Sequence, residues 1–207
     1  LLVVPIASRI PPRIVVPTAL MFSMSGYLLV AATAGHGDLG WLLLASVLLG
    51  IGIGSAETVS NELVLASAPP SKAGAASAVS ETAYELGAVL GTAVLGSILT
   101  ASYRSGLAMP AGVPPELATQ ARETLAGAYV VAGELTGSIG DALRDAAATA
   151  FDSGVAVTAA VGAGLMVLAA VIAATTLGSV PSSGSPTARS ENKESNVARG
   201  ETSRHPG

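Results

Sequence analysis

The chain has 207 residues, of which 50% are hydrophobic and only 12% are charged, about half the charged share of an ordinary soluble domain. Its net charge of −4 argues against a nucleic-acid binder that relies on positive charge, and the lack of cysteine excludes thiol catalysis, thiolate metal sites and a disulfide framework. The charged residues avoid four long stretches. Uncharged apolar stretches of about 20 residues are typical of membrane-spanning helices, so the sequence predicts an all-α membrane protein.

The expected elements follow the chain in a simple order. Residues 1–13 are predicted to hold the end of a truncated helix and a cytoplasmic loop, so we interpret the chain as a C-terminal fragment. Residues 14–101 are predicted to form three transmembrane helices, at 14–33, 41–66 and 73–101. A long extracytoplasmic loop, partly folded, is expected at 102–153, and the last transmembrane helix at 154–178. Residues 179–207 are too polar to bury a core and are predicted to be a disordered tail.

The positions of basic residues predict the orientation of the chain. Bases near the ends of spans are enriched on the cytoplasmic side. On one side of the predicted membrane lie Arg9, Arg13, Lys72, Arg189 and Lys193, whereas the long loop on the other side is rich in acids. We therefore expect the tail to be cytoplasmic, the loop to face outward, and the protein to be a multi-pass protein of the plasma (inner) membrane.

Three acids, Glu57, Glu81 and Glu85, lie deep inside the predicted spans. A charged side chain at the bilayer centre costs about 2.5–3.5 kcal/mol on insertion scales, so it usually faces a protein interior or a water-filled path. Glu81 and Glu85 lie roughly 12 Å and 18 Å along the third helix at about 1.5 Å per residue, too deep for simple capping. Both are candidates for a functional role, and the alternative is that they form buried ion pairs with bases elsewhere in a longer protein.

Glu81 and Glu85 are one helical turn apart and share a stripe of polar or small residues. Two such carboxylates repel each other when both are ionised, and desolvation adds to the cost of charge. We therefore expect the pair to exchange a proton for an organic cation. The neighbouring Tyr84 offers a ring face that attracts cations, or it is a packing aromatic.

Glu57, in the second span, follows a run of alternating glycines. It shares a helix face with Asn61, because the two are four residues apart. A structural hydrogen bond between them and a role in proton movement are both open interpretations. Glu57 therefore completes the set of candidate substrate-binding or proton-coupling residues.

The segment around these acids resembles a known family. The run Pro69-Pro70-Ser71-Lys72-Ala73-Gly74 leads to Ser80-Glu81-Thr82-Ala83-Tyr84-Glu85-Leu86-Gly87, followed by Gly91 and Gly96-Ser97. This is similar to the fourteen-span drug:proton antiporter branch (QacA/EmrB-like) of the major facilitator superfamily. The resemblance covers roughly residues 1–178. It implies that the four spans are the last four of fourteen, and that Glu81 and Glu85 help to recognise cationic drugs.

The stretch from Arg9 to Arg13 resembles the second copy of the superfamily's cytoplasmic Gly-x-x-x-Asp-Arg loop motif. Ser8 stands where the family has Asp, and Pro11-Pro12 replace the usual glycine-containing turn. The resemblance implies that the charges of this motif latch helix ends. Arg9 and Arg13 are therefore the candidate residues of the cytoplasmic loop.

The resemblance implies a proton-coupled multidrug efflux transporter that exports hydrophobic, often cationic compounds by alternating access. Its expected partners are the lipid bilayer, small substrates, protons and the missing N-terminal helices of the same transporter. Two alternatives stay open: an exporter of one specific metabolite, antibiotic or lipid, and a non-transporting membrane scaffold subunit. No nucleophile motif or phosphate-binding loop is present, so we predict no enzyme activity, no cofactor, no metal and no nucleic-acid partner.

Overall fold

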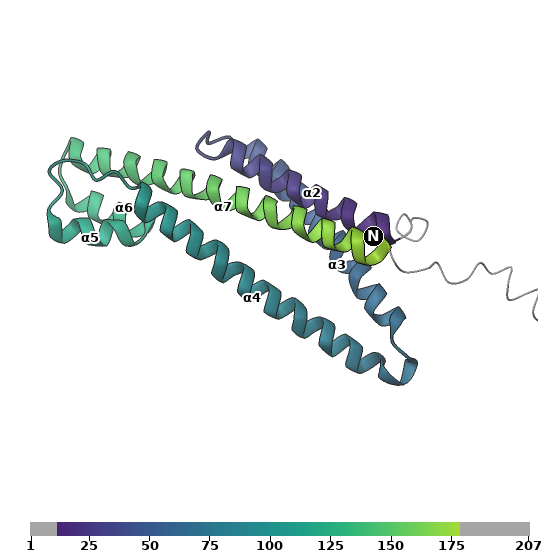
Figure 1. The fold of residues 1–207 in the computed structure, drawn as a ribbon. Helices are drawn as coiled ribbons and strands as arrows, with labels where there is room; N and C mark the ends of the chain where they lie inside the picture. The colour runs from purple at the N-terminus through teal and green to yellow at the C-terminus, as the bar shows by residue number, and fades with distance from the viewer. Residues whose placement is uncertain (1–11, 179–207) are drawn as a thin grey trace, which may run out of the picture.

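The computed structural model describes residues 12–178, and all regular structure in that part of the chain is helical (Figure 1). The elements are α2 (Pro12–Thr33), α3 (Leu39–Ser67), the 3-10 turn η1 (Pro70–Lys72), α4 (Ala73–Gly106), α5 (Pro115–Glu123), α6 (Leu125–Glu134) and α7 (Ser138–Gly178). Helices α2, α3, α4 and α7 are long and apolar enough to cross a membrane. They confirm the predicted all-α membrane fold with four spanning helices. The predicted truncated helix and the polar tail lie outside the described residues.

Helices α2 and α3 are joined by a short turn. Gly35 and Gly37 have φ angles of 82° and 66°, a region that glycine enters without a Cβ clash. The Asp38 side chain then accepts a hydrogen bond from the Gly40 N–H at 2.9 Å, which satisfies one of the free N–H groups at the start of α3. The turn thus brings α2 and α3 side by side as an antiparallel pair.

Small residues form the interface between α2 and α3. The buried residues of α3 recur every seven positions, at Ala45, Gly52 and Val59, a spacing that keeps them on one face of the helix. A Cβ atom on Gly52 would overlap Ser23 and the carbonyl oxygen of Ala19 on α2. The two backbones therefore approach closely, as is common where membrane helices meet at small residues.

Helix α7 packs along α2 and extends well beyond it (Figure 1). Its 41 residues correspond to about 62 Å at 1.5 Å per residue, roughly twice the 30 Å of a hydrocarbon core. The uncharged part of α7 contacts α2, where the Tyr27 ring lies against Gly162. The first part carries Asp141, Arg144 and Asp145. One continuous helix thus contains both the predicted last span and the end of the predicted loop.

Residues 102–153 are largely helical, and we call this segment the helical cap. It consists of the end of α4, the helices α5 and α6, and the first part of α7. Its core is made of aromatic, aliphatic and small side chains: Tyr103, Leu107, Ala121, Ala128, Val131, Ala132, Leu143, Ala147 and Ala150. The cap thus has an apolar core of its own, and its placement outside the membrane stays a prediction.

Two side chains of the cap cover helix ends reciprocally. The last carbonyl groups of a helix have no partner within it. The Tyr103 hydroxyl, from α4, shares its one proton between the carbonyl oxygens of Ala121 (2.9 Å) and Thr124 (3.2 Å) at the end of α5. In return, Nη1 of Arg122, from α5, donates to the carbonyl oxygen of Leu107 (3.2 Å) just after α4. The two helix ends therefore hold each other.

Helix α4 lies apart from the other long helices over much of its length. It meets α7 beside the cap and diverges from it toward η1 (Figure 1). Its large apolar residues Val79, Leu86, Val89 and Leu90 are each more than half exposed. The part of α4 that carries the predicted acids is therefore bounded by other helices on one side only.

Candidate functional site

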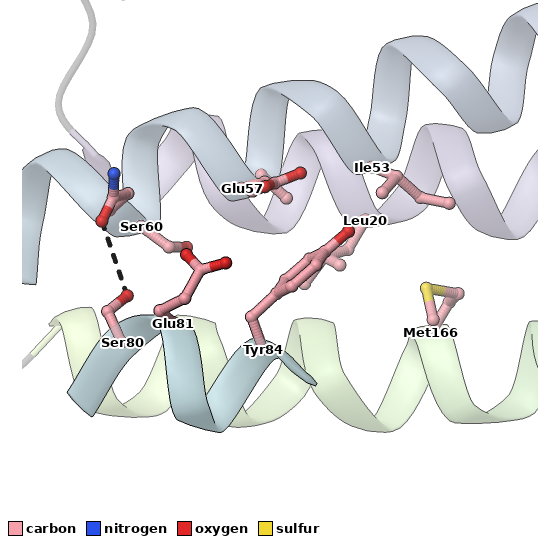
Figure 2. Close-up of a pocket in the computed structure, with 10 residues that line it drawn as sticks. Leu20, Ile53, Glu57, Ser60, Ser80, Glu81, Tyr84 and Met166 are labelled. Atoms are coloured by element: carbon pink, nitrogen blue, oxygen red, sulfur yellow. Dashed lines mark hydrogen bonds between the residues drawn. The ribbon is translucent and has the colours of Figure 1, made fainter. Parts of the chain in front are cut away.

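A groove of about 380 Å³ lies between α3 and α4 (Figure 2). Most of its lining comes from these two helices, and α2 and α7 contribute one residue each. The lining residues are Leu20 of α2, Ile53, Ala56, Glu57, Ser60 and Asn61 of α3, Ser80, Glu81 and Tyr84 of α4, and Met166 of α7. Three of the four predicted substrate-binding or proton-coupling residues, Glu57, Glu81 and Tyr84, thus meet in one groove.

Helix periodicity explains why these residues share the groove. On α3, Ile53, Glu57 and Asn61 are spaced four residues apart and fall on one face. On α4, Ser80 and Tyr84 have the same spacing, with Glu81 beside them. Each helix thus presents its lining residues on one face. Glu57 and Glu81, which are far apart in sequence, therefore line the same groove.

The groove is polar at one end and apolar at the other. Figure 2 shows the Glu81 carboxylate extending from α4 toward α3, close to Ser60, with Glu57 on α3 nearby. Ile53 and Met166 line the opposite end, and the Tyr84 ring lies between the two ends. Tyr84 is half exposed (50%), so part of its surface is open to a ligand. An amphiphilic cation would match this gradient, with its charge at the carboxylates and its apolar body at the other end.

A hydrogen bond joins α3 and α4 at the polar end. The Ser80 hydroxyl donates to Oδ1 of Asn61 at 3.5 Å. Asn61 was predicted as a possible partner of Glu57, but no hydrogen bond between these two side chains occurs among the described residues. The polar face of α3 therefore links to α4 through Asn61, and the Glu57 carboxylate stays available for another group.

Neither groove carboxylate has a basic partner in the described part of the chain. The one ion pair among residues 14–177, whose side chains the structure describes, joins Nη1 of Arg144 to Oδ1 of Asp141 at 2.8 Å, in the helical cap. The groove residues from α2 and α7, Leu20 and Met166, are uncharged. The described residues also contain no group of three or more side chains suited to a metal ion. No basic side chain among residues 14–177 therefore pairs with Glu57 or Glu81.

Glu85 lies outside the groove, although it was predicted to share a cavity with Glu81. It is one turn further along α4, and its side chain is exposed. The groove face of α4 runs through Ser80, Glu81 and Tyr84, because α4 approaches α3 from that side. A role for Glu85 stays a prediction, at a position roughly 40° around the helix from Glu81 that does not line the groove.

The two predicted arginines of the cytoplasmic loop have different outcomes. Arg9 lies outside the described residues. Arg13 belongs to α2, which begins at Pro12, so the predicted loop ends slightly earlier than expected. Helix ends defined in different ways commonly differ by one or two residues. The role of both arginines stays a prediction.

The sequence alone did not single out several lining residues. Ser80 had a detectable signal, because it precedes Glu81 and is four residues before Tyr84. Leu20 and Met166 had none, since each is an ordinary apolar residue of a spanning helix. Only the packing of α2 against α3, and of α7 against α2 and α4, brings them to the groove.

Known proteins match this chain over much of its length. A family model described as the Major Facilitator Superfamily matches residues 1–114, more than half of the chain. The multidrug efflux pump LfrA of Mycolicibacterium smegmatis is 45% identical over 172 residues, which are 83% of this chain and 34% of LfrA. The methyl viologen resistance protein SmvA of Salmonella typhimurium is 39% identical over 111 residues, 54% of this chain and 22% of SmvA. The chain thus spans about a third of the length of LfrA.

Proposed function

Because the chain belongs to the major facilitator superfamily, we propose that it forms the C-terminal part of a proton-coupled multidrug efflux transporter. This transporter exports hydrophobic, often cationic compounds across the plasma membrane by alternating access. The names of two relatives, a multidrug efflux pump and a methyl viologen resistance protein, support export of such compounds. The four spanning helices are then the last four of fourteen.

The observation that carries this proposal is the groove in which Glu57, Glu81 and Tyr84 meet. Its volume of about 380 Å³ falls within the range of small-molecule sites, roughly 300–1,000 Å³. A carboxylate kept at membrane depth usually faces a site or a pathway, and an aromatic ring attracts an organic cation. The groove thus has the size and the chemistry of a site for a cationic drug.

Proton coupling follows from competition for the same carboxylates. A glutamate in apolar surroundings is stabilised by a proton or by a cation, and one ligand displaces the other. Glu81 and Glu57 serve as the exchange sites in the groove, and Glu85 serves as a further proton-binding acid on the exposed face of α4. Arg9 and Arg13 latch the cytoplasmic ends of helices through their charges.

Alternating access requires more than this chain. Transporters of this kind work by rocking two halves about a site near the midplane of the membrane. The exposed side of α4, with Val79, Leu86 and Val89, is the surface that packs against the remaining helices of the transporter. The acids of α4 then lie between the two halves.

The test is ethidium efflux by cells that express the intact transporter carrying this chain, compared with the Glu81→Gln variant. We expect wild-type efflux to stop when a protonophore collapses the proton gradient, and the variant to lose roughly tenfold or more of the rate, about 1.4 kcal/mol. The Glu62→Gln variant is a matched control, because Glu62 is on α3 outside the groove. Normal efflux by a well-expressed Glu81→Gln variant would instead favour a structural role for the acid, and absence of efflux from well-expressed wild type would favour a non-transporting scaffold.

A further inference from the structure

The end of α4 that joins the helical cap is held by several contacts. The one buried residue within α4 is Tyr103, at this end, and its hydroxyl is hydrogen-bonded to carbonyl oxygens at the end of α5. Nη1 of Arg122 donates to the carbonyl oxygen of Leu107 at 3.2 Å. A Cβ atom on Gly106 would lie 3.8 Å from the Cβ of Ala150 on α7. The cap end of α4 is therefore fastened to both α5 and α7.

The opposite half of α4, residues 73–91, is held by much less, and we call it the free half. Every residue from 81 to 90 is exposed in this chain. Among the described residues, one hydrogen bond joins side chains of α3 and α4, from Ser80 to Asn61 at 3.5 Å, whereas hydroxyl donors usually bond at about 2.7–2.8 Å. Segments with few buried contacts open at a lower free-energy cost than packed ones. The free half can therefore leave α3 more easily than the cap end can leave α7.

We propose that α4 is a lever that pivots at the helical cap, so that its free half swings away from α3 and widens the groove toward η1. This inference rests on the proposed function, because it assigns a movement to the same groove. Helices α2, α3 and α7 stay together, since Gly52 packs against Ser23 and Gly162 packs against Tyr27. The exposed side of the free half meets helices outside this chain, and α4 transmits their movement to the groove.

The length of α4 makes a small tilt sufficient. Glu81 lies roughly 33 Å from Tyr103 at 1.5 Å per residue, so a tilt of about 5° about the cap moves it by roughly 3 Å. A displacement of this size breaks the long hydrogen bond from Ser80 to Asn61 and widens the groove. The link between α3 and α4, residues 68–72, keeps the facing helix ends within roughly 20 Å even when fully extended. The swing is therefore small and has a fixed limit.

The experiment locks each end of α4 with a disulfide in the intact transporter, made cysteine-free elsewhere. Asn61→Cys with Ser80→Cys locks the free half to α3. Gly106→Cys with Ala150→Cys is the matched control at the cap, because the 3.8 Å between its Cβ positions is typical of a disulfide. Ethidium transport into everted membrane vesicles is measured before oxidation, after oxidation and after reduction. We expect oxidation of the first pair to slow transport roughly tenfold or more relative to its own reduced form, reduction to restore it, and the control pair to change little.

The outcomes separate this inference from the proposed function. Undiminished transport by the cross-linked first pair, or failure of that pair to cross-link, overturns the lever while ethidium transport still supports the transporter. An equal loss on cross-linking the control pair overturns the pivot at the cap. A wild type that does not transport ethidium removes the proposed function, and the lever with it.

A distance measurement decides the matter where replacing the two groove residues by itself stops transport. Val64→Cys on α3 and Ser77→Cys on α4 are at exposed positions outside the groove and carry spin labels across the free half. Ser105→Cys with Asp145→Cys, also at exposed positions, reports on the cap end. We expect saturating ethidium to change the first label distance by roughly 3 Å or more, as the tilt requires, and to leave the second unchanged. An unchanged first distance, or an equal change in both, overturns the lever.

Discussion

The α2–α3 pair and the middle of α4 have similar compositions but different surroundings. Both are apolar helices with several glycines. In the pair, Gly26 lies against Leu49 and Gly52 lies against Ser23. On α4, a Cβ built on Gly87, Gly91 or Gly96 would have no neighbour within 4 Å in the described chain beyond the adjoining residues and backbone of its own helix. Glycine spacing alone therefore does not tell whether a face is already packed within this chain.

The comparison also explains where the acids occur. The α2–α3 interface contains no carboxylate, because a charge buried there would have no partner and no water. Glu57 and Glu81 line the groove that remains between α3 and α4, and Glu85 lies on α4 outside it. The proposed function accounts for the looser packing of α4, because it assigns the exposed side of this helix to a ligand and to the rest of the transporter. Gly52→Ala and Gly87→Ala test this difference directly, and Leu143→Ala and Tyr103→Phe in the helical cap measure the cost of disturbing a third, closely packed region.

The largest effect on stability is expected for Leu143→Ala in the helical cap. Leu143 is fully buried, and truncation of a buried leucine costs about 2–5 kcal/mol through lost contacts and a cavity. Limited proteolysis of the purified chain in detergent should show faster cleavage within the cap. Leu168→Ala, at an exposed position (56%) of the same helix, is the control and should leave the cap resistant. Equal cleavage of both variants would contradict a packed cap.

A smaller loss is expected for Gly52→Ala in the α2–α3 interface. The new methyl group would overlap Ser23 and the Ala19 carbonyl oxygen, and overpacking of this kind costs about 1–3 kcal/mol. Unfolding of the purified chain in mixed micelles, followed by circular dichroism, measures the change. An unaltered unfolding midpoint would mean that the helices separate more easily than the close contact implies.

Tyr103→Phe should cost about 1 kcal/mol. The variant keeps the ring in the core of the cap but removes the hydroxyl that donates to Ala121 and Thr124, and a typical hydrogen bond contributes about 0.5–1.5 kcal/mol. Hydrogen exchange should become faster at the end of α5. Tyr129→Phe is the matched control, because Tyr129 is 46% exposed on the neighbouring helix α6. Identical exchange in the two variants would rule out a stabilising role for the Tyr103 hydroxyl.

The smallest effect on the chain itself is expected for Gly87→Ala. Nothing in the described chain beyond the adjoining residues and backbone of its own helix lies within 4 Å of the added Cβ, and substitutions away from packed features usually change stability by less than about 0.5 kcal/mol. The unfolding midpoint should stay close to that of the wild type, in contrast to Gly52→Ala. A loss as large as that of Gly52→Ala would show that α4 packs more tightly than its exposed glycines indicate.

Composition was sufficient to predict the four spanning helices. Uncharged runs are long only where lipid surrounds the chain, so their positions follow from physical chemistry. The ends of the helices were less predictable, because charge marks the edge of the membrane and not the end of a helix. Helix α7 runs through the predicted boundary at residues 153 and 154 without a break. The packing within the cap was also hidden, since its core is largely alanine.

The candidate site was predictable only in part. Glu57, Glu81 and Tyr84 stood out as polar groups at membrane depth, and the structure brings them together. The partner of Glu81 was not predictable, because periodicity relates residues of one helix and gives no information about the rotation of a neighbouring helix. Glu85 therefore seemed the nearer partner, whereas the groove pairs Glu81 with Glu57.

Cysteine labelling can show whether a water-accessible groove for cations lies beside Glu81. The chain has no cysteine, so Ser60→Cys in the groove and Ser46→Cys outside it each add a single thiol. The two positions are a matched pair, because both are on α3 and each is seven residues from one end of that helix. The labelling is done in membranes that contain the intact transporter, made cysteine-free elsewhere. We expect a cationic methanethiosulfonate to label Ser60→Cys quickly and Ser46→Cys little. We also expect ethidium to slow the labelling of Ser60→Cys. Equal labelling of both positions, or labelling of Ser60→Cys that ethidium does not slow, would contradict such a groove.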